Sequence, residues 1–350
     1  MLLYGANGYT GELIARLAVT YNLQPILCGR NEAAITSLAK ELNLPHRIVS
    51  LEDTIALHEI LEDVDLVLHA AGPFQVTAAA MMEACLRTKT HYLDITGEIP
   101  VFEMAAQLDE RARAAGIMIM PGVGFDVVPT DCMALYLKNQ LLDAVQLQLA
   151  FASVGGSLSQ GTGSTMILGL GEGGLIRENG RIVKCPLGHK GMYINFDGEK
   201  KFVMTIPWGD VSTAYYTTSI PNIETYTAVP RKIFLFLRIQ TVFNRLLKTS
   251  FVRSLVRKKL RKLPAGPDER AREKSYSFVW GRVTNPQGKT VESSLKVANG
   301  YTLTAHSSLL IAQKVGEGSY KCGFQTPAKV YGADLILELP GSVRNPATAK

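Results

Sequence analysis

The sequence predicts a doubly wound parallel α/β sheet joined to a second α+β domain with a mostly antiparallel sheet. Through the first 130 residues, short apolar runs alternate six times with amphipathic helical segments, which is typical of a parallel sheet covered by helices. From residue 145 the period changes: Gln146–Phe151 alternates apolar and polar residues, as half-buried antiparallel strands do. We therefore expect a domain boundary near residue 130.

The composition narrows the class of protein. A chain of 350 residues is long enough for two cores, and 47% apolar with 19% charged residues is typical of globular proteins. Five cysteines without a Cys-x-x-Cys pair, and six scattered histidines, favour neither a disulfide framework nor a metal site. No apolar run reaches the roughly 18 residues of a spanning helix. We expect a reduced, cytoplasmic protein without bound metal.

Three glycines at three-residue spacing lie between the apolar run Leu2–Tyr4 and a helical segment that begins at Glu12. Strand, glycine turn and helix together are typical of a Rossmann-type dinucleotide site. The first glycine permits the tight turn, the second lets the backbone approach a pyrophosphate, and the third lets helix and strand pack closely. An ordinary surface turn is the alternative. The residues expected to bind the dinucleotide here are Gly5, Asn7, Gly8, Tyr9, Thr10 and Gly11.

Arg30 follows the second expected strand, 24–28. A site for NAD commonly has Asp or Glu about 20 residues after the glycines, where it binds the ribose 2′-hydroxyl. A guanidinium suits a 2′-phosphate instead, because it can form charge-assisted, bidentate hydrogen bonds. We therefore expect NADP(H) in preference to NAD(H). An arginine that ends a strand in solvent is the alternative interpretation.

Two further loops follow buried strands. The nearly all-apolar run 65–70 predicts a strand that is covered on both faces, and a loop of small residues comes directly after it. A further strand, 91–94, ends just before residues 96–98. Ligands of doubly wound sheets lie at the carboxyl ends of the strands. The cofactor-binding residues expected in these loops are Ala71, Gly72, Pro73, Phe74 and Gly97. Helices are expected over 32–42, 55–61, 77–88 and 101–115.

Asp126 and Asp131 flank the start of an expected helix, 127–140, shortly after the strand 117–120. Either carboxylate could face the reacting end of a cofactor. Either could equally cap the helix, which is the more common role of an aspartate at such a position. The two residues are therefore candidates for catalysis, with capping as the alternative.

Strands of the second domain are expected at 146–151, 202–206, 214–219, 224–229, 276–283 and 290–298. Asn285–Gly288 is the turn that joins the last two as a hairpin. A final helix of this domain is expected at 302–315, and another helix at 329–339. Tyr215 and Tyr216 would suit a substrate pocket, although packing against the sheet is an equal alternative.

Residues 231–263 hold eleven lysines and arginines and no acidic residue, with apolar residues interleaved. This pattern predicts one or two amphipathic helices that could contact an anionic membrane at its surface. A packed helix with solvated basic side chains is the alternative. Nucleic acid is not an expected partner, because no recognised nucleic-acid-binding fold accompanies the basic patch.

Several motifs occur in one order along nearly the whole chain: GANGYTG (5–11), GR (29–30), AAGPF (70–74), YLDITGE (92–98), GVGFDVVPTD (122–131), PWGDVSTA (207–214), AGPDERAR (265–272) and GFQTPA (323–328). In these motifs the chain resembles the saccharopine dehydrogenase-like oxidoreductases, in particular the branch with trans-acting enoyl reductases. The resemblance implies a nicotinamide cofactor and a Rossmann domain, 1–130, that a C-terminal helix at about 324–340 completes. It implies a substrate domain over 131–323, with Asp210 as a further candidate catalytic residue.

These observations predict an NADP(H)-dependent oxidoreductase that transfers hydride to an unsaturated or carbonyl substrate, which could be lipid-like. A saccharopine-type amino-acid dehydrogenase is one alternative, but it would need convergent cations to hold several carboxylates. A non-catalytic NADP(H)-binding sensor or adaptor is another. A small-molecule or lipid-like substrate is the expected partner, while a homodimer and a peripheral contact with an anionic membrane stay open.

Overall fold

The computed structural model of the chain describes residues 1–155, 159–168, 171–240, 249, 254 and 265–350. The chain divides into unit 1, Met1–Val128 with Tyr301–Val330, and unit 2, Pro129–Gly300 with Tyr331–Lys350. The first boundary lies two residues from the expected one at 130. The segment that returns to unit 1 differs from the expected 324–340: it starts at Tyr301 and includes the helix that we assigned to the second domain.

Unit 1 contains a parallel sheet with strand order β15-β6-β5-β4-β1-β2-β3 among the described residues. The strands are β1 (Leu2–Tyr4), β2 (Ile26–Gly29), β3 (His46–Ile48), β4 (Leu66–His69), β5 (His91–Asp94), β6 (Met118–Met120) and β15 (Gly323–Phe324). The order reverses at β1, so the sheet is doubly wound, as the alternation of strands and helices predicted. Every residue of β4 and β5 is buried, as expected for strands covered on both faces.

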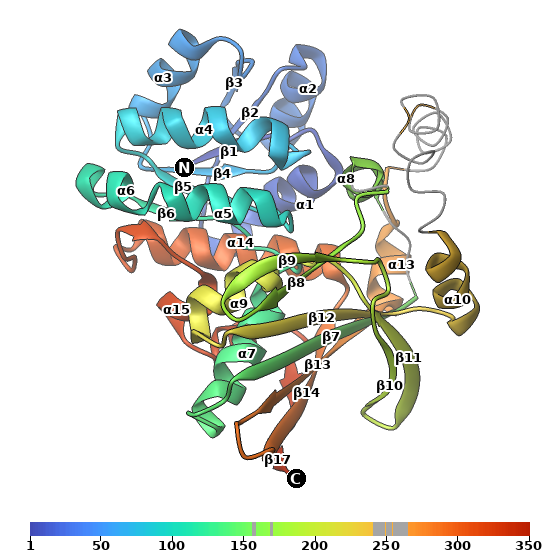
Figure 1. Cartoon of the computed structure of the whole chain (residues 1–350). Coiled ribbons are helices and arrows are strands. Elements are labelled where there is room, and N and C mark those ends of the chain that lie inside the picture. The colour runs from blue at the N-terminus through green and yellow to red at the C-terminus, as the bar shows by residue number, and fades with distance from the viewer. Residues whose placement is uncertain (156–158, 169–170, 241–248, 250–253, 255–264) are drawn as a thin grey trace. The chain divides into compact units, whose positions relative to one another are not determined.

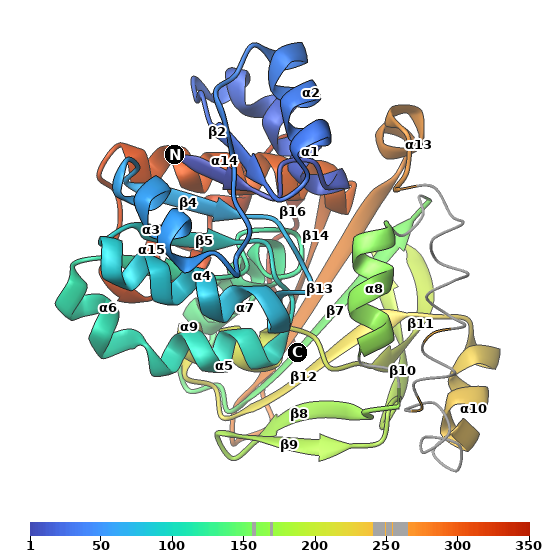
Figure 2. The same cartoon turned by 90° about the horizontal axis from the view of Figure 1, so that it is seen from above.

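Helices cover both faces of this sheet (Figures 1 and 2). One layer holds α1 (Tyr9–Leu17), α2 (Glu32–Leu42) and α14 (Gly300–Gly316), and the other holds α3 (Thr54–Glu62), α4 (Phe74–Thr88), α5 (Ile99–Gln107) and α6 (Asp109–Ala115). A 3₁₀ turn, η1 (Ala18–Tyr21), follows α1. The helix α14 returns to unit 1 because its side chains bond there: Ser307 Oγ donates to the Val123 carbonyl oxygen at 2.7 Å.

The expected helix 101–115 is two helices, α5 and α6, that meet at Leu108. Asp109 begins the second of them and accepts a hydrogen bond from the Phe324 amide at 2.7 Å. This long-range bond ties α6 to β15, which explains why the chain changes direction there. Gly116, with φ +75°, ends α6 as a left-handed C-cap, as expected.

Unit 2 contains a mostly antiparallel sheet with the order β10-β11-β12-β7-β13-β14-β16 in the part of the chain that the structure describes. Its strands are β7 (Gln146–Val154), β8 (Gly174–Glu178), β9 (Arg181–Cys185), β10 (Gly191–Phe196), β11 (Glu199–Thr205), β12 (Asn222–Ala228), β13 (Tyr276–Thr284), β14 (Thr290–Ala298), β16 (Val343–Arg344) and β17 (Thr348–Ala349). β7 and β12 are parallel neighbours. The turn at Asn285–Gly288 joins β13 and β14 as a hairpin, as expected.

The two faces of this sheet are covered differently. Helices α7 (Val128–Gln140) and α9 (Asp210–Thr218) lie on one face, where a Cβ at Gly281 of β13 would come within 2.6 Å of Leu137 Cδ1. On the other face, Phe278 and Trp280 form a core with Ile194 and Phe196 of the β10–β11 hairpin. The other helices of the described residues are α8 (Gln160–Leu168), α10 (Arg231–Gln240), α13 (Glu269–Lys274), α15 (Pro327–Tyr331) and the 3₁₀ turn η3 (Leu335–Glu338).

Two secondary-structure predictions are wrong. The expected strand 214–219 is the second half of helix α9, where Val211, Ala214 and Thr218 are buried at helical spacing. Tyrosine and threonine favour strands mainly where their side chains pack within a sheet. Here packing against α7 and β12 stabilises a helix instead. The expected helix 329–339 is α15 followed by η3, because Gly332, with φ +87°, interrupts it.

Of the basic segment 231–263, the structure describes α10, whereas 241–248, 250–253 and 255–263 lie outside the described residues. Among the described helices, none combines the length and the apolar character that crossing a membrane requires.

Candidate functional site

The glycine turn connects β1 to α1 and bonds to the neighbouring strand. Gly5, with φ +85°, and Ala6 both donate backbone hydrogen bonds to the Cys28 carbonyl oxygen, at 2.7 and 3.2 Å. A Cβ at Gly11 would lie 2.2 Å from the Gly5 carbonyl oxygen, so no side chain fits there. The third glycine therefore lets α1 approach the turn, as the sequence predicted.

Gly8 plays a different part. It is the exposed N-cap of α1, without a side-chain cap, and a Cβ there would meet only the Gly5 carbonyl oxygen, at 3.3 Å. The space beside this backbone is therefore open, at the positive end of a helix dipole. Asn7 is also exposed, and Tyr9 and Thr10 are half-buried in the first turn of α1. This cradle fits a pyrophosphate, whose oxygens helix N-termini commonly bind.

Arg30 lies at the carboxyl end of β2, the strand next to the glycine turn. Its side chain is exposed, and within the described part of the chain it forms no hydrogen bond or salt bridge. The next residue, Asn31, caps α2 by accepting a bond from the Ala34 amide at 3.1 Å. The local backbone is thus fixed while the guanidinium stays available to an anion.

The small-residue loop after β4 lies against the glycine turn. A Cβ at Gly5 would come within 2.8 Å of Ala71 Cβ. The two loops can therefore approach this closely only because Gly5 has no side chain. Beyond Gly72 and Pro73, Phe74 begins α4. This helix starts three residues earlier than expected, because the Glu98 carboxylate accepts hydrogen bonds from the Phe74 and Gln75 amides, both at 2.9 Å.

Glu98 has a role that the sequence alone did not reveal. Its carboxylate caps α4 from the loop after β5, which joins the ends of two adjacent strands. The position directly after a buried strand was the available signal, since such loops meet at one edge of a parallel sheet. The partner of this carboxylate, however, could be found only in the tertiary structure.

Asp126 packs on Gly97. A Cβ at Gly97 would come within 2.5 Å of Asp126 Oδ2, so the glycine makes room for this carboxyl group. Burial, and then the nearby Glu98 carboxylate, raise the pKa of Asp126 to about 7. The side chain is nevertheless half-buried and not enclosed. Asp126 is therefore an accessible acid that can hold a proton near neutral pH.

Two other buried groups at this edge have structural roles. Asp94 accepts hydrogen bonds from Tyr92 Oη, the Thr96 amide and the Gly122 amide, at 2.6, 2.9 and 2.8 Å, and burial raises its pKa to about 7. His69 at the end of β4 is fully buried, and burial lowers its pKa to about 3, so its ring is neutral. Neither side chain is exposed to a substrate.

The other two candidate aspartates belong to unit 2. Asp131 on α7 is fully buried and accepts a hydrogen bond from Thr217 Oγ1 of α9 at 2.5 Å, so it joins two helices. Asp210, in the first turn of α9, is also fully buried. Tyr215 packs under the Arg177 guanidinium at 4.2 Å, which favours the packing interpretation of this tyrosine.

No group of three or more His, Cys, Asp or Glu side chains is placed to hold a metal ion among the described residues. The edge of the parallel sheet in unit 1 therefore offers an open glycine cradle, an available guanidinium and a protonatable carboxyl group. Such a set can bind a dinucleotide and can supply a proton.

Comparisons with known proteins include this part of the chain. Residues 1–120 match the family model described as the saccharopine dehydrogenase NADP binding domain. The chain is 27% identical over 210 residues to the saccharopine dehydrogenase-like oxidoreductase of Mus musculus, a match that covers 53% of this chain and 49% of that protein. It is 28% identical over 151 residues to the trans-acting enoyl reductase of Mycobacterium leprae (strain TN), covering 41% of this chain and 36% of that protein.

A third relative, the lipid droplet localized protein of Caenorhabditis elegans, is 25% identical over 189 residues, which covers 49% of this chain and 44% of that protein. The chain thus spans about half the length, or less, of these curated relatives. In fold, it is similar to saccharopine dehydrogenase (L-Glu forming) from Saccharomyces cerevisiae, with a TM-score of 0.69, 13% identity, and coverage of 100% of this chain and 99% of that one.

These matches confirm the resemblance that the ordered motifs predicted, and they confirm the Rossmann fold of the first domain. The matched region, residues 1–120, contains the glycine turn, Arg30 and the loops after β4 and β5. Residues 1–120 are thus similar to the saccharopine dehydrogenase NADP-binding domain, and the longer matches resemble saccharopine dehydrogenase-like oxidoreductases.

Proposed function

We propose that the protein is an NADP(H)-dependent oxidoreductase that reduces an unsaturated or carbonyl substrate. The observation that carries this proposal is the open backbone at Gly8 beside the available guanidinium of Arg30. Gly5–Gly11 would hold the pyrophosphate, Arg30 the 2′-phosphate, and Ala71–Phe74 with Gly97 would line the rest of the site. A bound nicotinamide dinucleotide supplies the hydride chemistry, and the protein supplies binding and orientation.

Preference for NADP(H) follows from charge. A 2′-phosphate near Arg30 gains charge-assisted hydrogen bonds, whereas a free 2′-hydroxyl would need an acceptor at this strand end. No Asp or Glu stands at the end of β2 in the sequence, because residues 29–31 are Gly, Arg and Asn. The name of the matched family model, an NADP binding domain, supports the same choice.

Asp126 is the proposed proton donor. Reduction of a carbonyl or an activated double bond needs a proton as well as a hydride, and a general acid is most effective when its pKa lies near the working pH. Among the three candidate aspartates, Asp126 is half-buried, whereas Asp131 and Asp210 are fully buried. We therefore assign Asp131 and Asp210 to the support of α7 and α9.

The substrate class is proposed as lipid-like. Two relatives bear names that connect them with enoyl reduction and with lipid droplets. A saccharopine-type substrate would instead need several cations that converge on its carboxylates. Arg177, which is buried in unit 2, already donates to the carbonyl oxygens of Val211 and Gly180, so it does not serve as such a cation.

The experiment that tests this function follows NADPH oxidation with a panel of enoyl, keto and imine acceptors, both short-chain and long-chain. Turnover of an enoyl or keto acceptor, fastest with a long acyl chain, is the expected result. Turnover confined to imines formed from amino acids would favour the saccharopine-type alternative. Tight NADPH binding without turnover of any acceptor would favour the non-catalytic sensor.

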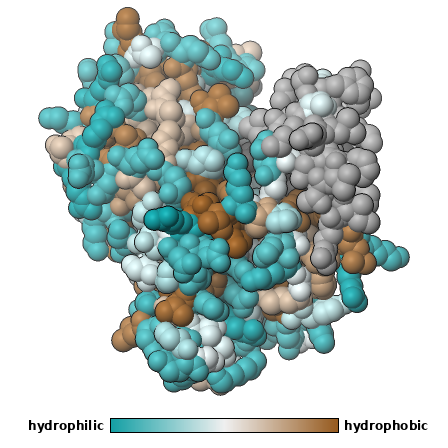
Figure 3. Space-filling model, viewed as in Figure 1, coloured by the Kyte–Doolittle hydropathy of each residue, from teal (hydrophilic) through white to brown (hydrophobic). Residues whose placement is uncertain are grey.

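A peripheral contact with an anionic membrane is a second proposal, which the surface of α10 favours. Phe234 is buried against Phe202, but Ile233 and Leu235 are 46% and 51% exposed beside the exposed Arg231 and Lys232. Figure 3 shows a hydrophobic patch where α10 lies in Figure 1. Exposed apolar and basic side chains on one helix are typical of helices that lie at a membrane surface.

Sedimentation with phosphatidylserine-containing vesicles tests this contact. The whole protein should sediment with anionic vesicles and not with phosphatidylcholine vesicles, and Leu235→Asp should reduce the bound fraction. Val343→Asp, at an exposed valine of β16, is the matched control and should not change it. Equal sedimentation of the Leu235 variant and the native protein would contradict the proposal.

A further inference from the structure

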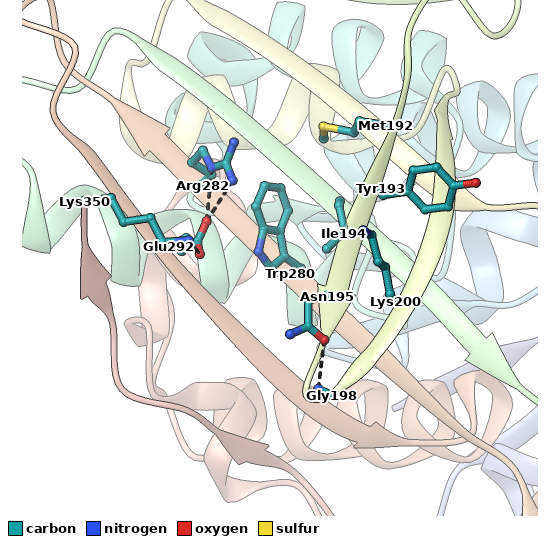
Figure 4. Close-up of a pocket in the computed structure, with 10 residues that line it drawn as sticks. All are labelled: Met192, Tyr193, Ile194, Asn195, Gly198, Lys200, Trp280, Arg282, Glu292 and Lys350. Carbon is teal, nitrogen blue, oxygen red and sulfur yellow. Dashed lines mark hydrogen bonds and ion pairs between the residues drawn. The ribbon is translucent and has the colours of Figure 1, made fainter.

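A pocket of about 460 Å³ is lined entirely by residues of unit 2. It opens between the β10–β11 hairpin and the strands β13 and β14, two parts of the sheet that do not pair with one another in the described structure. Its volume lies within the range of roughly 300–1,000 Å³ of small-molecule sites. Figure 4 shows the side chains that line it.

One wall of the pocket is apolar. Trp280, only 5% exposed, stands on β13 and faces Ile194 of β10, as Figure 4 shows, with Met192 beside them. The same indole belongs to the buried core between the two parts of the sheet. Packing in this core therefore fixes the position of the indole at the edge of the pocket.

Cationic side chains flank this indole: Figure 4 shows Arg282 and Lys350 on one side of Trp280 and Lys200 on the other. Arg282 lies with its guanidinium carbon 4.9 Å from the Trp280 ring centre and donates to Glu292 through Nε and Nη2, at 3.2 and 2.9 Å. Lys350 also pairs with Glu292. Burial by itself would raise the pKa of Glu292, but the hydrogen bonds from Lys350 and Arg282 outweigh it and hold this pKa below its ordinary value.

The lining thus has three cations and one carboxylate, and that carboxylate already has two cationic partners. Lys200 lies 5.3 Å from the Tyr193 ring centre and forms no salt bridge within the described residues. A cationic ligand would find no carboxylate to pair with, whereas an anionic one would meet Lys200 and the Nη1 group of Arg282. A neutral apolar ligand would gain only from the apolar wall.

We propose that this pocket binds a small monoanionic amphiphile, such as a medium-chain carboxylate, with its apolar body along Trp280 and its head group between Lys200 and Arg282. Charge-assisted hydrogen bonds to the head group would provide orientation, and burial of the chain would provide much of the affinity. The pocket would then be a ligand site of unit 2 that is separate from the dinucleotide cradle.

The probe for this site is 10-bromodecanoate, whose bromine quenches tryptophan fluorescence on contact. The chain has two tryptophans, so a Trp208→Phe background leaves Trp280 as the single reporter. We expect saturable quenching by 10-bromodecanoate, with about tenfold or more weaker binding of neutral 10-bromodecanol, since a hydrogen bond to a charged group is lost. The measurement needs neither cofactor nor turnover, so its outcome is independent of the oxidoreductase activity.

Two charge variants complete the test. Lys200→Gln should weaken 10-bromodecanoate binding about fivefold, as for a solvent-exposed charge pair, and Arg282→Gln about tenfold or more. Lys201→Gln is the matched control, because Lys201 pairs with Glu199 and does not line this pocket. It should leave the affinity unchanged.

Three results would overturn the proposal: no quenching at millimolar 10-bromodecanoate, equal affinity for acid and alcohol, or unchanged affinity in the Lys200 variant. Inorganic phosphate should compete only weakly. If phosphate displaced the probe as well as decanoate does, the site would bind simple anions, and the assignment to an amphiphile would be wrong.

Discussion

The glycine cradle of unit 1 is built from backbone, whereas the pocket of unit 2 is built from side chains. At the edge, Gly5, Gly8 and Gly11 remove side chains so that loops can touch and a helix N-terminus stays open. At the pocket, the side chains of Lys200, Trp280, Arg282 and Lys350 come from distant parts of the sequence. Each region can attract an anion, but through different atoms.

This difference decides how each region responds to amino-acid substitution. A site made of backbone is sensitive to any added atom, because a new Cβ collides with a carbonyl group that cannot move away. A site made of flexible side chains tolerates added atoms better and responds instead to the loss of charge. Substitutions in both units test these roles, and they are ordered here from the largest expected effect to the smallest.

Asp126→Asn would sharpen the assignment of the edge as the reacting site. With an acceptor that the panel identifies, kcat should fall by about 100- to 10,000-fold, since a general acid is lost. The acid is protonated below its pKa of about 7, so native kcat should be highest below pH 7 and decrease as pH rises through it. The Asn variant should lose this dependence.

The matched control for Asp126 is Asp94→Asn. Asp94 also has a pKa raised to about 7, but it is fully buried and bonded to Tyr92 and two amides. Its folded-state pKa lies above its unfolded value, so it favours the folded state most at low pH, and this contribution is lost as pH rises from about 4 to 7. In Asp94→Asn, the stability measured by thermal unfolding should depend less on pH, whereas the pH profile of kcat should stay unchanged. A pH profile that moves with Asp94 and not with Asp126 would break the assignment.

Gly11→Ala and Gly8→Ala separate the two tasks of the glycine turn. The first should lower the free energy of unfolding by about 3 kcal/mol, because its Cβ would lie 2.2 Å from a backbone oxygen. The second should change stability by less than about 1 kcal/mol and weaken NADPH binding about tenfold, because its Cβ would point into the open cradle. Urea denaturation and fluorescence titration measure both. A Gly8 variant that binds NADPH normally would exclude the cradle as the pyrophosphate site.

Arg30→Ser tests the choice of cofactor. NADPH affinity should fall about 10- to 100-fold, while NADH affinity should stay the same, because only the 2′-phosphate is lost as a partner. Arg47→Ser is the control, since Arg47 is an exposed arginine of the adjacent strand β3 that donates to the His46 carbonyl oxygen. A parallel loss of NADPH and NADH affinity at Arg30 would mean that it serves the fold and not cofactor preference.

Gly281→Ala tests how unit 2 responds to a Cβ added at a closely packed glycine. A Cβ there would meet Leu137 Cδ1 at 2.6 Å and Met133 Cγ at 2.8 Å, which are side-chain atoms that can shift. The free energy of unfolding should therefore fall by only about 1 kcal/mol, less than for Gly11→Ala, and NADPH affinity should not change. A loss as large as that of Gly11→Ala would show that α7 is held as rigidly as the glycine turn.

Much of unit 1 could be predicted from the sequence because its signals are local. The glycine spacing, Arg30 at a strand end and the alternation of buried strands with amphipathic helices each lie within a short window. The cap residues Asn31 and Gly116 likewise act on their own helices. Local periodicity therefore determined the doubly wound sheet, and the glycine spacing determined the tight turn between β1 and α1.

The remaining features depend on contacts between distant residues. Packing against α7 and β12 makes residues 214–218 helical, although their composition favours a strand. Ser307 bonds to Val123 and returns α14 to unit 1, and Glu98 caps α4 from another loop. The room for Asp126 on Gly97 and the pocket beside Trp280 arise in the same way.

By itself, then, the sequence determined the periodic elements and the glycine cradle, because their physical causes lie within one turn or one strand. Only the tertiary structure decided which carboxyl group lies at the edge with a raised pKa, and which cations share a pocket with an indole. Burial and proximity produce both properties, and neither burial nor proximity has a fixed spacing along the chain.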